Sequence, residues 1–242
     1  MNTKIFQEEI QLLYNRMVSE QPFAFSKFAD GEWMALNGIQ NHNNEWVMND
    51  ITLSVKYSES RRMLLESLQY KHPEYFVGIS CRCCQGDRVH EEMKVVSGQN
   101  LSNLTFANIF VNANYNFFLD QFIPYFSKTE LPLVLVANKN SDLAKLPFKV
   151  SKFYGIHYNA WVNQEDLSLI NDEIFLNHNN SIILFSAGPF GNIAVHQGWK
   201  KNRSNQYIDI GSTIDLWLDN DKFNKRNYSI GDKNFSEKVC VW

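Results

Sequence analysis

The sequence contains few cysteines and no long hydrophobic run. Only 4 of its 242 residues are cysteine. No stretch approaches the ~18 consecutive apolar residues that a membrane-spanning helix needs, and Glu8 and Glu9 interrupt the region where a signal peptide has its apolar core. We therefore expect a soluble, cytoplasmic protein that has no transmembrane segment and is not secreted.

The cysteines do not form a complete zinc-binding pattern. Cys81 and Cys84 have the Cys-x-x-Cys spacing, with Cys83 between them. A structural zinc ion takes about four ligands. No second Cys-x-x-Cys or His-x-x-x-His follows, so only the distant His90 and Cys240 could complete such a site. We expect free thiols, which a reducing cytosol favours, and zinc or redox chemistry is the alternative.

The sequence also lacks an excess of positive charge. Its 23 Lys and Arg against 26 Asp and Glu give a formal net charge of -3. A protein that grips nucleic acid through a broad surface needs clustered Lys and Arg to neutralise the phosphates. The charge therefore argues against a nucleic-acid partner, and it leaves room for a local basic patch.

Apolar and aromatic side chains, by contrast, are abundant. Hydrophobic residues make up 44% of the chain and aromatic residues 14%, including 18 Phe and 10 Tyr, which is enough for one large core. Apolar segments of strand length alternate with segments of helical periodicity. This alternation predicts one α/β domain over residues 1–242, with a Rossmann-like, mostly parallel sheet of about six strands flanked by helices.

The expected elements follow one another along the chain. Strands or extended segments are expected over 23–28, 75–80, 107–111, 132–137, 148–156, 181–186 and 206–212. Helices are expected over 3–20, 33–36, 51–70, 114–126, 163–176 and 190–199. The segment 81–84 is expected to be a loop, and the charged, Asn-rich residues 219–242 a peripheral tail.

The most informative motif is Asp30-Gly31-Glu32, directly after the expected strand over 23–28. Two carboxylates separated by one glycine at a strand end can reach one small volume. Such a volume suits a hard divalent cation that keeps positions open for a phosphate-bearing substrate. The structural alternative is that Asp30 caps the next helix and that Glu32 is a first-turn acid favoured by the helix dipole.

Glycine-rich and polar segments follow three other expected strands. After the strand over 181–186, a glycine loop and a helix form an arrangement that aims backbone N–H groups at a phosphate. Because the carboxyl ends of parallel strands share one edge, we expect these segments to meet in one cleft. The residues expected there, around a nucleotide diphosphate and with Asp30 and Glu32, are Asn138, Gly188, Pro189, Gly191, Asp209, Gly211 and Ser212.

Three short blocks resemble the GT-D type glycosyltransferases, whose signature is an Asp-x-Glu motif. The blocks are 27–32, 186–189 and 208–211, and the resemblance spans about residues 20–217. Lys27 and Ala29 stand where that family usually has arginine and glycine, and Ser212 stands where it has histidine. The replacement of arginine keeps the charge but loses bidentate phosphate recognition.

The resemblance implies a metal-dependent transferase. Asp30 and Glu32 would be catalytic and would bind Mn²⁺ or Mg²⁺, while Lys27 and Phe28 would contact a nucleotide-sugar donor, with UDP as the expected nucleotide. The acceptor would be a hydroxyl group of a glycan, a glycoprotein or a lipid-linked molecule.

Two other functions fit an α/β domain. One is a nucleotide-cofactor enzyme such as a methyltransferase or dehydrogenase, although the first strand lacks the Gly-x-Gly-x-x-Gly turn of a dinucleotide site. The other is a non-catalytic module that binds a nucleotide or sugar through aromatic stacking. The general base for a transferase stays open among Asp209, Asp215, His157 and Glu32, as does the oligomeric state.

Overall fold

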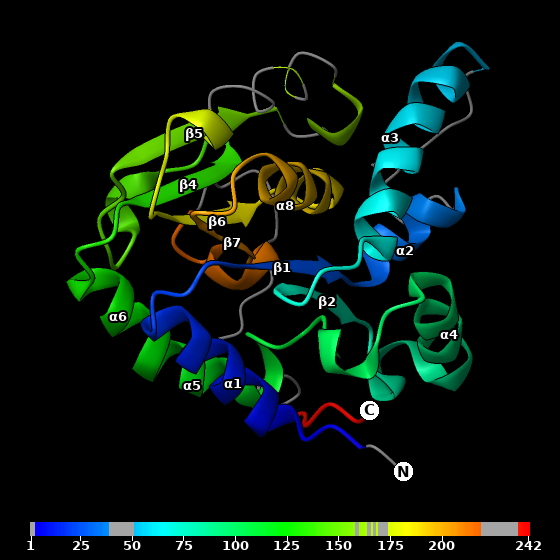
Figure 1. Ribbon diagram of the computed structural model, residues 1–242, viewed down its shortest axis with the longest axis horizontal. Helices are drawn as coiled ribbons and strands as arrows, with labels where there is room; N and C mark the ends of the chain where they lie inside the picture. Colours follow the sequence, from blue (N-terminus) through cyan, green and yellow to red (C-terminus); the bar gives the residue numbers. More distant parts are fainter. Residues whose placement is uncertain are drawn as a thin grey trace.

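The computed structural model describes residues 3–38, 51–157, 160–163, 166, 168, 174–218 and 237–242. Its seven strands form one sheet in the order β3-β2-β1-β7-β6-β4-β5, and every neighbouring pair is parallel (Figure 1). The strands are β1 (Phe23–Phe28), β2 (Tyr75–Ile79), β3 (Leu104–Phe106), β4 (Leu133–Asn138), β5 (Lys152–Ile156), β6 (Ile182–Ser186) and β7 (Gln206–Asp209).

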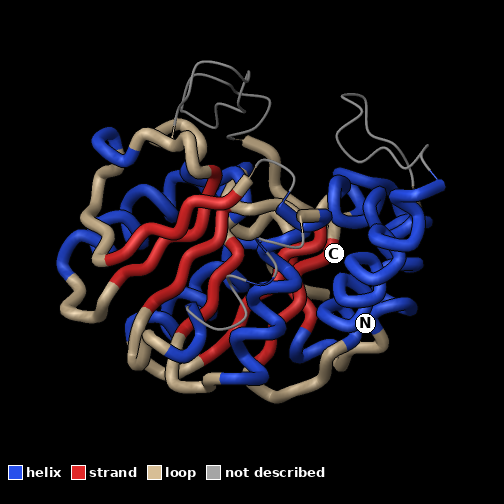
Figure 2. Tube along the Cα trace, turned by 90° about the horizontal axis from the view of Figure 1, so that it is seen from above, coloured by secondary structure: helices blue, strands red, loops and turns tan. Residues whose placement is uncertain are grey.

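Helices cover both faces of this sheet (Figure 2). The α-helices are α1 (Phe6–Val18), α2 (Asp30–Asn37), α3 (Ile51–Gln69), α4 (Arg82–Ser97), α5 (Tyr115–Phe117), α6 (Ile123–Lys128) and α8 (Pro189–Lys201). The 3₁₀-helical turns are η1 (Leu101–Asn103), η2 (Asn112–Asn114), η4 (Leu143–Lys145), η5 (Ala160–Val162) and η7 (Gly211–Ile214), and η3 (Phe118–Phe122) is a turn of π-helix. None of the described helices combines the length and the apolar character needed to cross a membrane.

The core consists of two clusters of buried side chains, one on each face of the sheet. Phe23 and Phe25 of β1 join the cluster that contains α1, α5 and α6. Ala24 and Phe28 join the cluster that contains α3 and α8. The alternation follows from the period of two in a strand, and because both faces are covered, the strands read as continuous apolar runs.

The structure confirms the α/β class and changes some predicted elements. The sheet has seven strands instead of about six, and all of its pairs are parallel. The strand expected over 107–111 lies earlier, at β3, because backbone bonds from Ile109 to Phe106 and from Val111 to Asn108 turn the chain just after it. The segment 81–84, expected to be a loop, instead begins α4 at Arg82. Most of the helix expected over 163–176 lies outside the described residues.

The last six residues of the chain pack against the domain. Most of the predicted peripheral tail, 219–236, lies outside the described residues. In the remaining part, 237–242, Cys240 is only 3% exposed. The carbonyl of Val241 accepts the N–H of Arg82 at 3.1 Å, and the carbonyl of Lys238 accepts the N–H of Ala113 at 3.0 Å. The C-terminus therefore lies beside the start of α4 and near the N-terminus (Figure 1).

Candidate active site

The ends of four neighbouring strands meet at one edge of the sheet. In a parallel sheet the carboxyl ends of all strands share that edge. Strand β7 pairs with β1 on one side and with β6 on the other, and β6 pairs with β4. The structure therefore brings the segments that follow β1, β7, β6 and β4 side by side in that order.

Asp30 and Glu32 lie at the start of α2, directly after β1. Ala29 has an extended backbone and is the N-cap, so Asp30 is the first helical residue. The Glu32 side chain is 7% exposed and turns back toward the strand, where its Oε2 accepts the N–H of Ala29 at 2.8 Å. Glu32 thus supports the helix start, and the capping role considered for Asp30 is wrong. Asp30 is half-buried at the edge.

Asp209 is a third carboxylate, buried at the end of β7. It is 2% exposed, and its Oδ1 and Oδ2 accept the N–H groups of Gly211 at 3.0 Å and of Lys27 at 3.3 Å. Burial raises the pKa of the Asp209 carboxyl to about 7, while the charge of Lys27 lowers that pKa and the charge of Glu32 raises it. Asp209 is therefore close enough to Glu32 to be repelled by it, and it changes charge near neutral pH.

The side chain of Lys27 lies along Gly211. A Cβ atom at Gly211 would stand 3.0 Å from the Lys27 Nζ, and the backbone φ of +53° also favours glycine. Asn192 of α8 is fully buried, and its Nδ2 donates to the carbonyl of Lys27 at 2.7 Å and to Oγ of Ser26 at 3.1 Å. Asn192, which the sequence analysis did not predict as a site residue, thus connects α8 to the end of β1 through these two hydrogen bonds. Its only sequence signal is a polar residue on an apolar helix.

The turn from β6 into α8 contains Gly188, whose φ of 55° and ψ of -147° suit glycine alone. Pro189 follows at the first position of the 13-residue helix α8. The positive end of this helix lies at the same edge as Asp30. Gly191, further into α8, faces the sheet, because an added Cβ would stand 3.5 Å from Cγ of Asp209. Gly191 therefore permits close packing of α8 on β7.

Phe28 belongs to the core, whereas Asn138 stays at the end of β4 and also shapes a turn. The side chain of Phe28 is fully buried in the core cluster beside α3 and α8, so it does not line the edge. Asn138, at the end of β4, accepts the N–H of Asn140 on its Oδ1 at 2.9 Å and so shapes its own turn. Ser212 is half-buried in η7, next to Gly211.

His157 follows β5, far from the three carboxylates. Its Nδ1 lies 3.0 Å from Oδ2 of Asp166, which is 2% exposed and also accepts the backbone N–H of His157 at 3.2 Å. Strand β5 is four positions from β1 in the sheet, which corresponds to about 19 Å at the usual strand spacing. The structure therefore separates His157 from Asp30. Asp215, in contrast, accepts a hydrogen bond from Oγ of Ser186 at 3.3 Å, beside β6 and β7.

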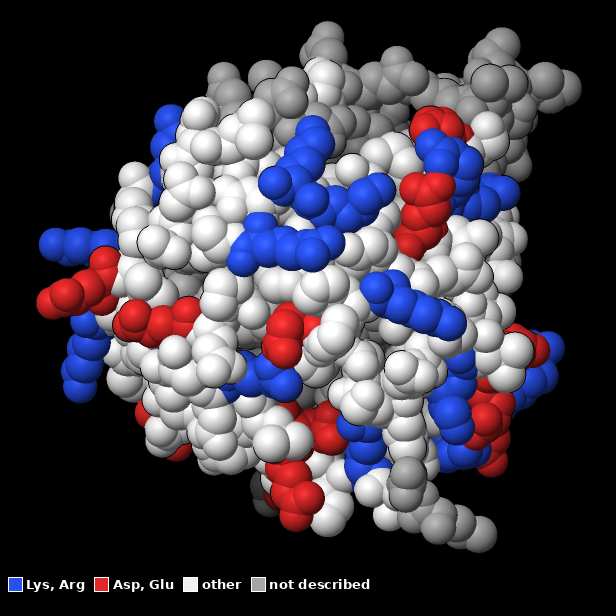
Figure 3. Space-filling view, viewed as in Figure 1, with Lys and Arg blue, Asp and Glu red and all other residues white. Residues whose placement is uncertain are grey.

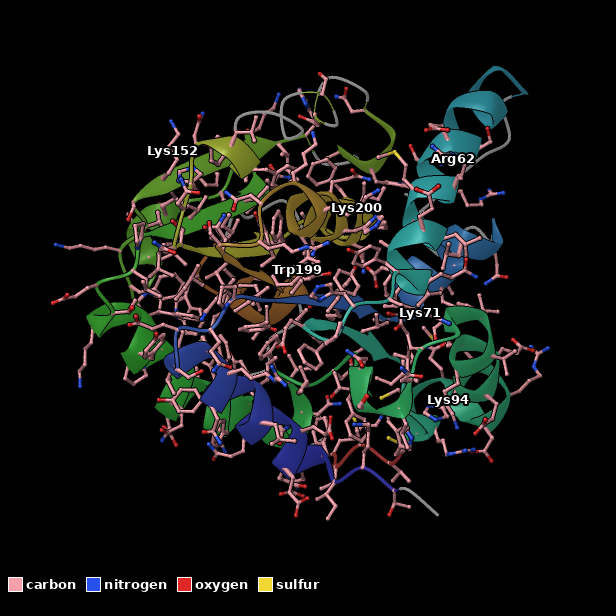
Figure 4. The ribbon with its side chains drawn as sticks, in the orientation of Figure 1. Arg62, Lys71, Lys94, Lys152, Trp199 and Lys200 are labelled. Carbon is pink, nitrogen blue, oxygen red and sulfur yellow. The ribbon has the colours of Figure 1, made fainter. Side chains whose placement is uncertain are left out.

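Lys and Arg side chains gather across the middle of one face of the molecule (Figure 3). Figure 4 places Lys200 and Lys71 in this region, at the C-terminal end of α8 and just after α3. Lys200 and Lys201 lie in the last turn of α8, where positive charge is favourable. The site lies at the other end of this helix, about 20 Å away at 1.5 Å per residue. This local patch is thus distinct from the edge that carries Asp30.

The fold matches that of solved structures. A structure of the domain of unknown function 1792, described as having a distinct glycosyltransferase fold, matches with a TM-score of 0.57 at 15% identity. The selenomethionine-substituted structure of this domain matches with a TM-score of 0.56 at 14% identity. Both matches cover 94% of this chain and 87% of the other chain.

The sequence itself gives no such match. No family model matches it, and neither does any curated protein. The structural similarity establishes the fold of this chain, which is an α/β glycosyltransferase fold with a parallel, Rossmann-like sheet. The resemblance that the three sequence blocks indicated is confirmed at this level.

Proposed function

We propose that this protein is a metal-dependent glycosyltransferase. It transfers a sugar from a nucleotide-diphosphate sugar, with UDP as the first nucleotide to test, to a hydroxyl group of a glycan, glycoprotein or lipid-linked acceptor. The observation that carries this proposal is the pair Asp30 and Glu32 directly after strand β1, beside the buried Asp209 of the neighbouring strand β7. The glycosyltransferase fold of the structural neighbours favours this function over a methyltransferase or a dehydrogenase.

The carboxylates fit a Mn²⁺ or Mg²⁺ ion that binds together with the donor. Mg²⁺ commonly takes one or two carboxylates, and waters and substrate phosphates fill its other positions. Asp30 and Glu32 supply such a pair. Asp209, whose pKa is raised mainly by burial and in smaller part by the charge of Glu32, adds a third carboxylate whose negative charge a cation would offset. Asp30 and Glu32 would hold the ion, and the chemistry that it would supply is neutralisation of the charge that develops on the diphosphate leaving group.

Groups of the protein hold the donor diphosphate in this proposal. The Lys27 ammonium, lying along Gly211, offers a positive charge next to the carboxylates. The turn at Gly188 leads into the N-terminus of α8, which favours a phosphate through its dipole and backbone N–H groups. The donor diphosphate then spans from the end of β1 to the end of β6, across β7.

Asp215 is the best-placed general base among the four candidates. His157 follows β5, which lies four strands from β1 in the sheet. The distance of ~19 Å is too long for His157 to take a proton from an acceptor hydroxyl at the Asp30 site. Asp209 and Glu32 are both buried, and Glu32 accepts the N–H of Ala29, so neither is well placed to reach an acceptor hydroxyl. Asp215 is half-buried at the edge and is oriented by Ser186. We assign it to the acceptor hydroxyl.

The first test is calorimetric titration of the protein with UDP, with and without Mn²⁺. The second test is mass-spectrometric detection of donor hydrolysis or sugar transfer across a panel of nucleotide sugars. We expect metal-dependent UDP binding and turnover of at least one donor. Binding of S-adenosylmethionine or NAD instead would support a nucleotide-cofactor enzyme. UDP binding without turnover of any donor would support a non-catalytic module.

The variants Asp30→Asn and Glu32→Gln remove the charges while keeping side-chain shape. Each should lower donor turnover at least about a hundredfold, because the leaving-group charge is no longer neutralised. Glu8→Gln is the matched control, since Glu8 is an exposed first-turn acid of α1. Wild-type turnover in folded Asp30→Asn and Glu32→Gln proteins would refute the assignment.

A further inference from the structure

The fold brings all four cysteines of the chain into one cluster. The Sγ atoms of Cys81, Cys83, Cys84 and Cys240 all lie within 4.8 Å of one another. All four are free thiols, two of them buried, one half-buried and one exposed. Within the described parts of the chain, this is the one group of three or more metal-ligating side chains that converges in this way. Sulfur atoms gather where α4 begins and the C-terminal segment ends (Figure 4).

Two distant parts of the sequence build this cluster. Three of the thiols follow β2 and occupy the start of α4, and the fourth comes from Cys240 in the C-terminal segment. That segment is held in place independently of the sulfurs. The ring of Trp242 contacts the rings of His90 and Phe106, with centroids at 4.9 Å and 5.2 Å, and Arg82 donates its N–H to Val241. The convergence therefore follows from the packing of the C-terminus.

We propose that this four-cysteine cluster binds one Zn²⁺ ion as a closed, structural site. Tetrahedral zinc with bonds of about 2.3 Å to sulfur separates its ligand atoms by about 3.8 Å. The observed upper limit of 4.8 Å needs only small side-chain adjustments to reach that geometry. Four thiolates with no open position are typical of structural zinc, and soft sulfur ligands exclude the Mn²⁺ or Mg²⁺ proposed for Asp30 and Glu32.

Polar groups around the sulfurs support thiolate ligands. The amide Nδ2 of Asn108 donates to Sγ of Cys84 at 3.2 Å, and that of Asn112 donates to Sγ of Cys240 at 3.4 Å. Asn112 does so from a positive φ of 57°, which asparagine tolerates. Outer hydrogen bonds of this kind orient metal ligands and offset the negative charge of a four-thiolate site.

The proposal differs from the free thiols that the sequence predicts. The reason is that the fourth ligand, Cys240, is separated from Cys84 by more than 150 positions, and only the fold places it there. A zinc ion in the cluster fastens residues 237–242 to the start of α4. The cluster shares no residue with the Asp30 site, so its zinc content can be measured separately from any glycosyltransferase activity.

The first experiment measures metal in the wild-type protein, purified without chelators from zinc-supplemented medium. Elemental analysis should give about one zinc per chain. X-ray absorption at the zinc edge should show four sulfur neighbours at about 2.3 Å. Iron in place of zinc, zinc bound by nitrogen or oxygen, zinc below about 0.1 per chain, or a disulfide in protein isolated under reducing conditions would each overturn the proposal.

A pair of variants tests the ligands. Cys84→Ser and Cys240→Ser should each lower the zinc content at least about fivefold and the melting temperature by more than about 5 °C. The matched control is Gln85→Ser, which places the same residue next to Cys84 without removing a thiol. Full zinc content in either cysteine variant would overturn the proposal. If a variant does not fold, X-ray absorption of the wild-type protein still decides it.

Discussion

Replacing Asp209 by asparagine should change how the stability of this protein depends on pH. The carboxyl of Asp209 is buried, and its pKa is raised from 3.8 to about 7. Asparagine has nearly the same shape, and its oxygen can accept one of the two N–H groups that Asp209 holds, from Lys27 and Gly211. The substitution therefore removes the titration while largely preserving the packing.

The direction of the change in unfolding free energy depends on whether Asp209 ionises first in the folded or in the unfolded chain. Well below the ordinary pKa of 3.8, Asp209 is protonated in the folded and the unfolded chain alike. As the pH rises from about 4 to about 7, the unfolded chain ionises first, so the folded protein loses stability. Above about pH 7 both states are ionised and the loss is complete. A pKa difference of this size corresponds to about 4 kcal/mol of unfolding free energy.

The assay is urea unfolding of wild-type protein and Asp209→Asn at several pH values from 4 to 8, followed by circular dichroism. The free energy of unfolding of the variant relative to wild type should rise by about 4 kcal/mol across this range, whatever constant difference the lost hydrogen bond causes. Asp87→Asn removes a carboxylate whose side chain is 80% exposed and is the control. Parallel pH profiles for wild type and Asp209→Asn would refute the reasoning.

Four further predictions concern three glycines and an asparagine. Gly198→Ala should destabilise the protein by about 1–3 kcal/mol in urea unfolding, because the added Cβ stands 2.5 Å from a ring carbon of Tyr207. Gly31→Ala, with no atom within 4 Å of its Cβ, should instead be neutral or stabilising by up to about 1 kcal/mol, and a loss of stability there would contradict the geometry. Gly188→Val should weaken UDP binding in calorimetry at least tenfold, about 1.4 kcal/mol, with a native circular dichroism spectrum, and unchanged affinity would move the diphosphate elsewhere. Asn192→Ala should lower the unfolding free energy by about 1–3 kcal/mol because it removes the donor to the partly buried carbonyl of Lys27, whereas a change below about 0.3 kcal/mol would show that the bond is dispensable.

The sequence alone determined the class of fold and the edge of the sheet that carries the candidate site. Buried parallel strands are continuous apolar runs, so segments such as 23–28 and 181–186 could be recognised locally. The carboxyl ends of such strands share one edge, and the position of Asp30 and Glu32 after a strand therefore indicated where they lie. Both inferences depend only on neighbours along the chain.

The tertiary structure decided which residues meet and what surrounds them. The shifted pKa of Asp209 depends on burial under α8 and on Lys27 and Glu32, which come from other elements. Phe28 points into the core because of its register in β1. Cys240 joins Cys81–Cys84 because the C-terminus packs on α4. Such encounters depend on strand order and on packing between residues more than a hundred positions apart, and local patterns in a sequence carry no information about either.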